Sequence, residues 1–374
     1  MTTSVVISGT GLWTPSHKIT NEELVEAYNG YAEKFNADNR TDIEIGELAA
    51  KPLSSAEFIE KASGIRSRYT YIKDGILDIT RMRPNIPKRA DDELSDQAEM
   101  AIHAAKKALT AANKTAADID AVIVSCAYTQ RSYPALAIEV QEALGIKGFG
   151  FDMLVACSAA TFALHRAYEM IAAGTAKGVL VINPELTSPQ VNYGDRDSHF
   201  IFGDVATALV VEAAETADAE HVYEIMSTKA VTSYSNNIRS NFGYVSRAND
   251  SDPFANDMLF HQEGRKVFKE VCPMAVEHIN EHLQRHSLDS SNVKRWWLHQ
   301  ANINMNSLIS KKLLGREASL EEAPIVLDTY ANTASAGSII AFNLHHQDLV
   351  SGEIGLLCSF GAGYSIGSLI LKKH

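Results

Sequence analysis

The sequence predicts an α/β fold built from two similar halves, and three observations support this prediction. From Ser95 onward, apolar runs typical of buried strands alternate with helical segments. The same order of segments recurs in the second half of the chain. Several segments of the two halves also align with each other at a nearly constant spacing. The alternation indicates a mainly parallel sheet, and the recurrence indicates a duplicated unit.

The duplication rests on three overlays between the halves. AADIDAVIVSCA overlays SSNVKRWWLHQA with Ala116 on Ser290, LVACSAAT overlays TYANTASA with Cys157 on Asn332, and GVLVI overlays GLLCS with Gly178 on Gly355, at offsets of 174, 175 and 177 residues. Three matches in the same order favour a true repeat over chance. We assign the halves to residues 1–215 and 216–374.

Apolar runs predict the strands of the first half, and helical patterns predict the segments between them. The expected strands are Val5–Ile7 (ended by Gly9 and Gly11), Asp118–Ala127, a run beginning at Phe149, Gly178–Asn183 and Ala206–Ala213. The expected helices are Asn21–Ala27, Ala56–Ala62, a helix from Ser95 to about Ala112, and Ala135–Leu144. Two polar insertions, near 28–56 and 73–92, predict long loops that help to cover the site.

The second half gives a parallel series. The expected strands are a run through Asn292–Leu298, Ile325–Leu327, Gly355–Ser359 and Ser365–Leu371, and the expected helices are Arg265–His286, Asn304–Leu314 and Ala336–Leu349. This series places His299 near the C-terminal end of a strand. Ligands of parallel α/β sheets bind at that end of the strands.

Composition narrows the class of protein. The 374 residues are 45% hydrophobic and 21% charged, with a net charge of −12 that argues against nucleic-acid binding. Four cysteines lie without metal-ligand or disulfide spacing, as expected in a reducing cytoplasm. The N-terminus lacks the pattern of a signal peptide, and no apolar run is long enough to span a bilayer.

Cys157 is the candidate nucleophile. It follows the strand that begins at Phe149 and lies on a tight turn at the start of a helix. Free N–H groups and the positive end of the helix dipole favour a thiolate there. A cysteine can also be a small core residue, so this segment alone leaves both interpretations open.

Two further residues fit a carbon–carbon bond-forming thiolate enzyme. His299 and Asn332 can each donate an N–H to a thioester oxygen and stabilise an enolate. In the glycine-rich run SFGAGYSIG, Gly361 is a candidate substrate-binding residue, and the N–H groups of Ala362 and Cys157 could form an oxyanion hole. The alternatives are a core histidine, a helix cap and an ordinary turn. We expect no metal site, because His345 and His346 lack partners at ligand spacing.

These residues lie within motifs that resemble the β-ketoacyl-acyl-carrier-protein synthase III family of the thiolase superfamily. The motifs are GIRSR (64–68), ACSA around Cys157, DRDSHFIFGD (195–204), GRKVFK (264–269), LHQANIN (298–304), YANTASAGS (330–338) and FGAGYSIG (360–367). The resemblance implies a five-layered α-β-α-β-α fold, a homodimer, and a triad of Cys157, His299 and Asn332. It also implies that Tyr133 reaches into the partner's acyl pocket.

The resemblance extends to substrates, with departures. Arg196 matches a residue that contacts coenzyme A at the entrance, and the family docks its carrier protein through basic residues in the region of Lys269, Lys311 and Lys312. A tryptophan and an arginine that hold the adenine in the family correspond here to Phe58 and Ala62, and Asn304 replaces a common arginine. We therefore expect a medium-chain acyl primer, bound largely through its chain. The alternative is acetyl-CoA, with Arg66, Arg68, Arg81, Arg83 or Lys88 replacing the missing contacts.

The resulting hypothesis is a cytoplasmic condensing enzyme of fatty acid biosynthesis. An acyl-CoA would acylate Cys157, and a malonyl thioester, expected on acyl carrier protein, would lose CO2 and attack it to give a 3-oxoacyl product. No cofactor, nucleic acid or membrane is implied. The open alternatives are an acyltransferase to a non-carbon nucleophile, a polyketide starter synthase, and a catalytically silent partner subunit. A 3-hydroxy-3-methylglutaryl-CoA synthase would need a further carboxylic acid that the sequence does not place.

Overall fold

The computed structural model describes residues 3–240, 255 and 258–374. Nine strands form one mixed sheet in the order β11-β12-β13-β8-β1-β7-β6-β4-β5. The strands are β1 (Val5–Trp13), β4 (Ala121–Cys126), β5 (Phe149–Leu154), β6 (Gly178–Glu185), β7 (Val205–Ala213), β8 (Tyr223–Thr232), β11 (Val293–Leu298), β12 (Ile354–Gly361) and β13 (Ser365–Lys373). Two small ribbons pair β2 (His17–Thr20) with β3 (Ser67–Thr70), and β9 (Ile238–Arg239) with β10 (His261–Gln262).

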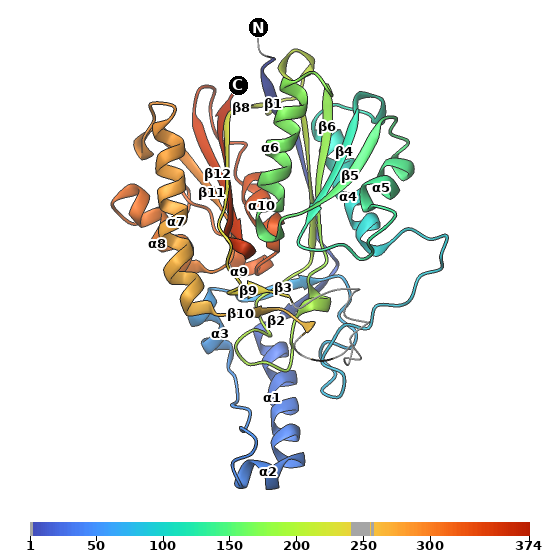
Figure 1. The fold of residues 1–374 in the computed structure, drawn as a ribbon, viewed down its shortest axis with the longest axis vertical. Coiled ribbons are helices and arrows are strands. Elements are labelled where there is room, and N and C mark those ends of the chain that lie inside the picture. The colour runs from blue at the N-terminus through green and yellow to red at the C-terminus, as the bar shows by residue number, and fades with distance from the viewer. Residues whose placement is uncertain (1–2, 241–254, 256–257) are drawn as a thin grey trace.

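Six of the described helices cover the outer faces of both half-sheets and fill the space between them: α4 (Asp96–Ala111), α5 (Leu136–Leu144), α6 (Ala159–Ala172), α7 (Gly264–Gln284), α8 (Ile303–Leu314) and α10 (Gly337–Leu344) (Figure 1). The others are α1 (Asn21–Asp38), α2 (Arg40–Glu44), α3 (Ala56–Ser63) and α9 (Leu327–Tyr330). The central core packs α6 and α10 between the half-sheets. Separate cores pack α4 and α5 outside one half-sheet, and α7 and α8 outside the other. The expected five-layered α-β-α-β-α fold is therefore confirmed.

The strand order itself repeats. The first half gives β1-β7-β6-β4-β5, and the second gives β8-β13-β12-β11. The fifth strand, expected at Ile325–Leu327, is absent, and this prediction is wrong. The N–H groups of Val326 and Leu327 donate to the side-chain oxygen of Gln300, at 3.0 and 3.3 Å, and α9 begins at Leu327. These donors therefore do not join a strand ladder. A boundary at 215/216, between β7 and β8, stays our proposal.

The sheet is less parallel than expected. Only β4 with β5 and β6, and β11 with β12, run parallel, and the other pairs are antiparallel. Strand β8, which joins the halves through β1 and β13, was not expected from the sequence. Gly9 and Gly11 do not end β1. A Cβ on them would lie 2.3 Å from Ala108 O and 2.2 Å from Ala104 O, so the glycines let α4 pack directly on the strand.

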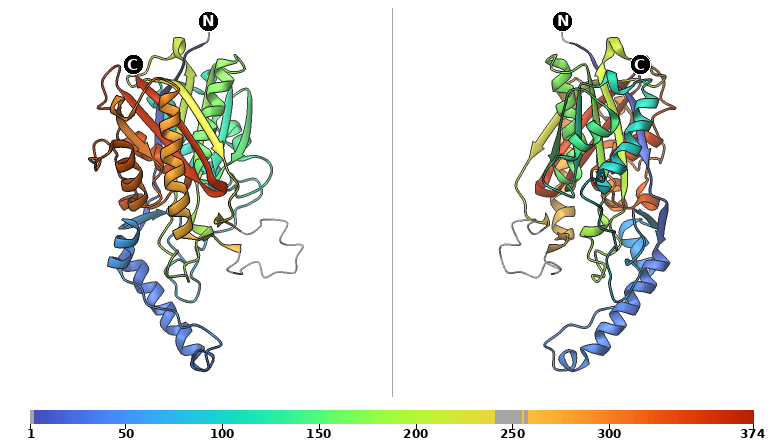
Figure 2. Two further views of the ribbon diagram at one scale, coloured as in Figure 1. Left: turned by 60° about the vertical axis from the view of Figure 1, so that its left-hand side comes forward. Right: turned by 90° about the vertical axis from the view of Figure 1, so that its right-hand side faces the viewer.

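The two insertions differ from each other. The first is mainly helical, because α1 continues to Asp38 from a capping box between Thr20 and Glu23. With α2 it forms an arm that projects from the body of the molecule (Figure 2). The loop expected at 28–56 is thus wrong for its first part. The second insertion contains no helix or strand, as expected.

The backbone conformation shows that the overlay around Cys157 has a different register from the one expected. Ala156 and Ala334 have φ of +46° and +47°, and each opens a 3₁₀ turn, at Ala156–Ser158 and Ala334–Ala336, followed by a central helix. The structural offset is therefore 178 residues, and Ser335 corresponds to Cys157. The expected match of Cys157 with Asn332 is wrong by three residues. No helix in the described part of the chain is long and apolar enough to cross a membrane.

Candidate active site

Cys157 lies in the turn between β5 and α6. The next residue, Ser158, donates its hydroxyl to Ser365 O at 2.7 Å and so fixes the turn to the start of β13. From the other side, a Cβ on Gly361 would lie 2.7 Å from the Cys157 Cβ and 3.0 Å from its backbone nitrogen. Side chains rarely allow backbone segments so close, which explains the glycine at this position.

His299 directly follows β11. Its N–H donates to Cys358 O at 2.8 Å, and its ring meets Phe360 edge-to-face at 5.1 Å. Burial lowers the pKa of His299 to about 4, so the imidazole is neutral near pH 7. Its Nδ1 has no hydrogen-bond partner in the described structure.

Asn332 is fixed at both ends. Its backbone N–H donates to Ile201 O at 2.9 Å, and its carbonyl accepts from Gly203 N at 3.1 Å. Its side-chain Oδ1 accepts from Ala334 N at 3.0 Å. Because the oxygen is held in this way, the amide Nδ2 remains to donate to a ligand.

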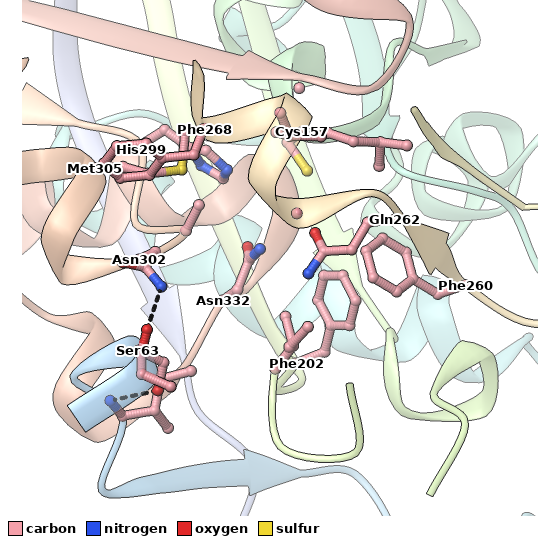
Figure 3. A pocket seen from close by; sticks show the side chains of 18 of the residues that line it. Ser63, Cys157, Phe202, Phe260, Gln262, Phe268, His299, Asn302, Met305 and Asn332 are labelled. Atoms are coloured by element: carbon pink, nitrogen blue, oxygen red, sulfur yellow. Dashed lines mark hydrogen bonds between the residues drawn. The ribbon is translucent and has the colours of Figure 1, made fainter. Parts of the chain in front are cut away.

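The three side chains meet at one cavity of about 330 Å³, as Figure 3 shows. The cavity lies in the range typical of small-molecule sites. Its apolar lining consists of Phe58, Ala62, Ile65, Phe200, Ile201, Phe202, Ile238, Phe260, Val267, Phe268, Val271, Ala301, Met305 and Phe360. A cysteine, a neutral histidine and an amide at an apolar cavity suit acyl transfer through a thioester.

The thiol is not preactivated as the sequence analysis expected. Burial, together with the nearby Glu185 carboxylate, raises the pKa of Cys157 to about 12. The expected thiolate is therefore not favoured by these surroundings. Glu185 is a buried carboxyl group that the sequence analysis missed. Its position at the end of β6 could have indicated it, since functional groups gather at such strand ends.

The other predicted residues lie at differing distances from the cavity. Gly361 and Phe58 line it, whereas Ala362 opens the turn just beyond Gly361. The Arg196 guanidinium lies over the Phe58 ring at 3.7 Å from the ring centre, and its Nε donates to Leu53 O at 2.8 Å. Tyr133 is 85% exposed and does not contribute to the cavity lining of this chain.

The residues named as alternative contacts for the adenine lie in different environments. Arg68 is buried and donates to Ile19 O, Asn21 Oδ1 and Phe200 O, so it is a structural residue and this alternative is wrong for it. The Arg66 guanidinium pairs with Glu60 at 2.8 Å. Asn304 lies beside Ala62 and donates weakly to its carbonyl, at 3.5 Å.

The predicted carrier-docking lysines lie on two adjacent outer helices, α7 and α8 (Figure 1). Lys269 and Lys312 are exposed and have no ion pair among the described residues. Lys311 pairs with Glu317 at 2.7 Å, which neutralises part of its charge. In the described ranges, no group of three histidine, cysteine or acidic side chains could hold a metal ion.

The chain is similar to known acyl-carrier-protein synthases. Residues 151–231 match the family model of 3-oxoacyl-[acyl-carrier-protein] synthase III, and residues 283–373 match its C-terminal model. The β-ketodecanoyl-[acyl-carrier-protein] synthase of Pseudomonas aeruginosa is 55% identical over 94% of this chain and all of its own. The chain belongs to the β-ketoacyl-acyl-carrier-protein synthase III family.

Further relatives agree. The β-ketoacyl-[acyl-carrier-protein] synthase III of Granulibacter bethesdensis is 28% identical over 98% of both chains. The priming β-ketosynthase of the R1128 polyketide pathway shares the fold, with a TM-score of 0.78 and 22% identity over 99% of this chain and 96% of its own. The synthase III of Aquifex aeolicus gives 0.73 at 24% identity, covering 98% and 99%. This ketoacyl synthase III is thus a condensing acyltransferase of fatty acid biosynthesis.

Proposed function

We propose that this synthase condenses a medium-chain acyl group, delivered to Cys157 by coenzyme A, with malonyl-acyl carrier protein. The observation that carries the proposal is the meeting of Cys157, His299 and Asn332 at one apolar cavity. In the first half-reaction the Cys157 sulfur bonds to the acyl carbon. The bond to the coenzyme A sulfur breaks, and that sulfur ends with the thiol proton. No cofactor takes part in the proposed steps.

In the second half-reaction, malonyl thioester loses CO2. The N–H groups of neutral His299 and of Asn332 Nδ2 would donate to the thioester oxygen as it gains negative charge. The resulting carbanion attacks the acyl-Cys157 carbon, and the cysteine sulfur leaves. The product is a 3-oxoacyl chain two carbons longer. The N–H groups of Cys157 and Ala362 would hold the oxygen of the tetrahedral intermediate.

Two findings support a medium-chain primer. The cavity is lined mainly by apolar side chains, and each buried CH₂ contributes about 0.8 kcal/mol. The 55% identical relative is named for a ten-carbon ketoacyl product, which condensation with malonate would make from an eight-carbon primer. Arg196 and Phe58, stacked at 3.7 Å beside the cavity, would contact the coenzyme A head group.

We also propose a homodimer. β5 is the last strand of the sheet, so one of its edges is unpaired, and its ends carry exposed Phe149 (43%) and Leu154 (56%). Unprotected apolar strand edges favour pairing with another chain. Pairing there would cover the exposed Tyr133 on the neighbouring loop, as the expected role in the partner's acyl pocket requires.

We also propose a cytoplasmic location. All four cysteines are free thiols, as expected of a protein in a reducing compartment.

A panel of acyl-CoAs tests the proposal. The enzyme should gain the mass of one acyl group on Cys157, and kcat/KM should be higher for octanoyl-CoA than for acetyl-CoA at fixed malonyl-acyl carrier protein. Cys157→Ala should fold but gain no mass. Acetyl-CoA as the best primer would contradict the chain-length proposal. No acylation of the wild type would favour the silent-subunit alternative, and acylation without ketoacyl product would favour a transferase to another nucleophile.

A further inference from the structure

Glu185 is a buried carboxyl group with a defined set of donors. It is the last residue of β6 and is 0% exposed. Its Oε1 accepts from the N–H of Ser335, at 3.1 Å, and from the Ser335 hydroxyl. The N–H of Ala127, at the end of β4, donates to both carboxyl oxygens at 3.2 and 3.1 Å. Burying such a group is costly unless its partners are fixed, so this contact is a specific one.

The contact joins the two halves of the molecule at the active site. Ser335 belongs to the turn Ala334–Ala336, and the N–H of Ala334 in the same turn holds Asn332 Oδ1 at 3.0 Å. Two alanines on either side of Asn332 have positive φ, Ala331 at +58° and Ala334, in this turn, at +47°. Such residues cost on the order of 1–3 kcal/mol each and persist only where their surroundings hold them. The two bonds from Ser335 to Glu185 tie this turn to the opposite half of the molecule.

We propose that Glu185 is a positioning residue, which orients the Asn332 amide for malonyl decarboxylation by binding the Ser335 turn. It would not activate the cysteine, because Glu185 in its ionised form raises the pKa of the nearby Cys157 thiol. Its effect should therefore fall on the half-reaction that uses Asn332. The proposal rests on the proposed function for the assignment of that half-reaction.

Glu185→Gln is the sharpest variant. Glutamine keeps the size of the side chain, but only its carbonyl oxygen can accept. With that oxygen on Ser335 the NH₂ group faces the N–H of Ala127, and with it on Ala127 both bonds to Ser335 are lost, so either orientation sets donor against donor and weakens the hold on the turn. We expect decarboxylation of malonyl thioester to fall by roughly tenfold or more, while acylation of Cys157 stays within about threefold. Released CO2 and acyl-enzyme mass report the two half-reactions separately.

A double variant distinguishes positioning from general damage. Glu185→Gln combined with Asn332→Ala should decarboxylate no more slowly than Asn332→Ala alone, because both changes remove the same interaction. Additive losses, or equal losses in both half-reactions, would overturn the proposal. Glu139→Gln is the matched control. Glu139, on α5, is also a buried carboxylate and pairs with Arg131, and its loss should leave the ratio of half-reactions unchanged.

Two further measurements keep the test decisive. If Glu185→Gln does not fold, Ser335→Ala removes the hydroxyl donor alone and should show the same pattern to a smaller extent. If the wild type neither acylates nor decarboxylates, the proposed function is wrong. The side-chain amide resonance of Asn332 then tests the positioning role directly. It should shift in Glu185→Gln, and an unchanged resonance would contradict the role.

Discussion

Gly361 and Cys157 lie so close together that a methyl group on the glycine would stand 2.7 Å from the Cys157 Cβ. Contacts this short do not occur between real side chains. Any larger residue at position 361 would therefore displace either its own turn or Cys157. Gly361 has an extended backbone, with φ of −170°, so alanine would introduce only a steric conflict and no backbone strain. The relationship explains how the end of β12 fixes the position of Cys157.

Gly361→Ala should therefore reduce Cys157 acylation by about a hundredfold, since small displacements of reacting groups can cost that much. Stability should fall by about 1–3 kcal/mol, the usual cost of overpacking a core. Stopped-flow acylation and thermal unfolding measure the two effects. Gly30→Ala, in the projecting α1, is the control and should leave acylation unchanged. Normal acylation in Gly361→Ala would show that the turn can adjust.

His299→Ala and Asn332→Ala should impair decarboxylation more than acylation. Each change removes one donor to the developing negative charge, and such a loss typically costs on the order of 10²–10³ in rate. The measurement compares CO2 release from malonyl thioester with acyl-enzyme mass in each variant. Wild-type decarboxylation in both variants would contradict the roles proposed for these residues.

The carrier surface is tested by charge reversal on α7 and α8. Lys269→Glu and Lys312→Glu should raise the KM for malonyl-acyl carrier protein and weaken its salt dependence, because an acidic carrier would lose attraction. Lys311→Glu should have a smaller effect, since Glu317 already pairs with Lys311. Lys106→Glu, on the outer helix α4 of the other half, is the control. Equal effects at Lys106 and Lys269 would indicate nonspecific electrostatics.

Acid stability should depend on a buried histidine between α7 and the sheet. His282 is 1% exposed, and its ring bonds Ser368 Oγ at 2.7 Å and Ser227 Oγ at 3.0 Å. Burial lowers its pKa from 6.5 to about 3. Between these values the unfolded chain binds a proton that the folded chain does not, so His282 makes the fold less stable as the pH falls.

His282→Gln should remove this dependence while keeping hydrogen-bonding groups at the site. Relative to the variant, the wild type should lose at most about 1.4 kcal/mol per pH unit as the pH falls from 6.5 towards 3. Chemical denaturation of both proteins at several pH values measures the difference. Parallel stability curves would contradict the assignment.

The motifs alone predicted the layered fold, which the structure confirms, and they selected Cys157, His299 and Asn332 as candidate catalytic residues, which line one cavity. Local patterns in the sequence indicate strands, helices and turns. In a parallel sheet, the C-terminal ends of neighbouring strands lie at the same edge, even where the strands are far apart in the chain. ACSA around Cys157 follows β5, and HQAN, which begins at His299, follows β11, whereas NTASA, which begins at Asn332, follows the short helix α9 in place of the expected strand. The α1 arm was not predicted. Its polar residues resemble those of a loop, but a capping box at Thr20 and Glu23 begins a helix that continues to Asp38.

The tertiary structure decided the environment of those residues. Burial raises the pKa of Cys157, together with the Glu185 carboxyl group, and lowers the pKa of His299, and burial depends on segments distant in sequence. The backbone at Ala156 and Ala334 set the true register of the repeat and made Ser335 the counterpart of Cys157. Glu185 meets Ser335 across 150 positions of chain. A sequence lists which groups are present, but only packing brings a carboxylate, a turn and an amide together and removes the water between them.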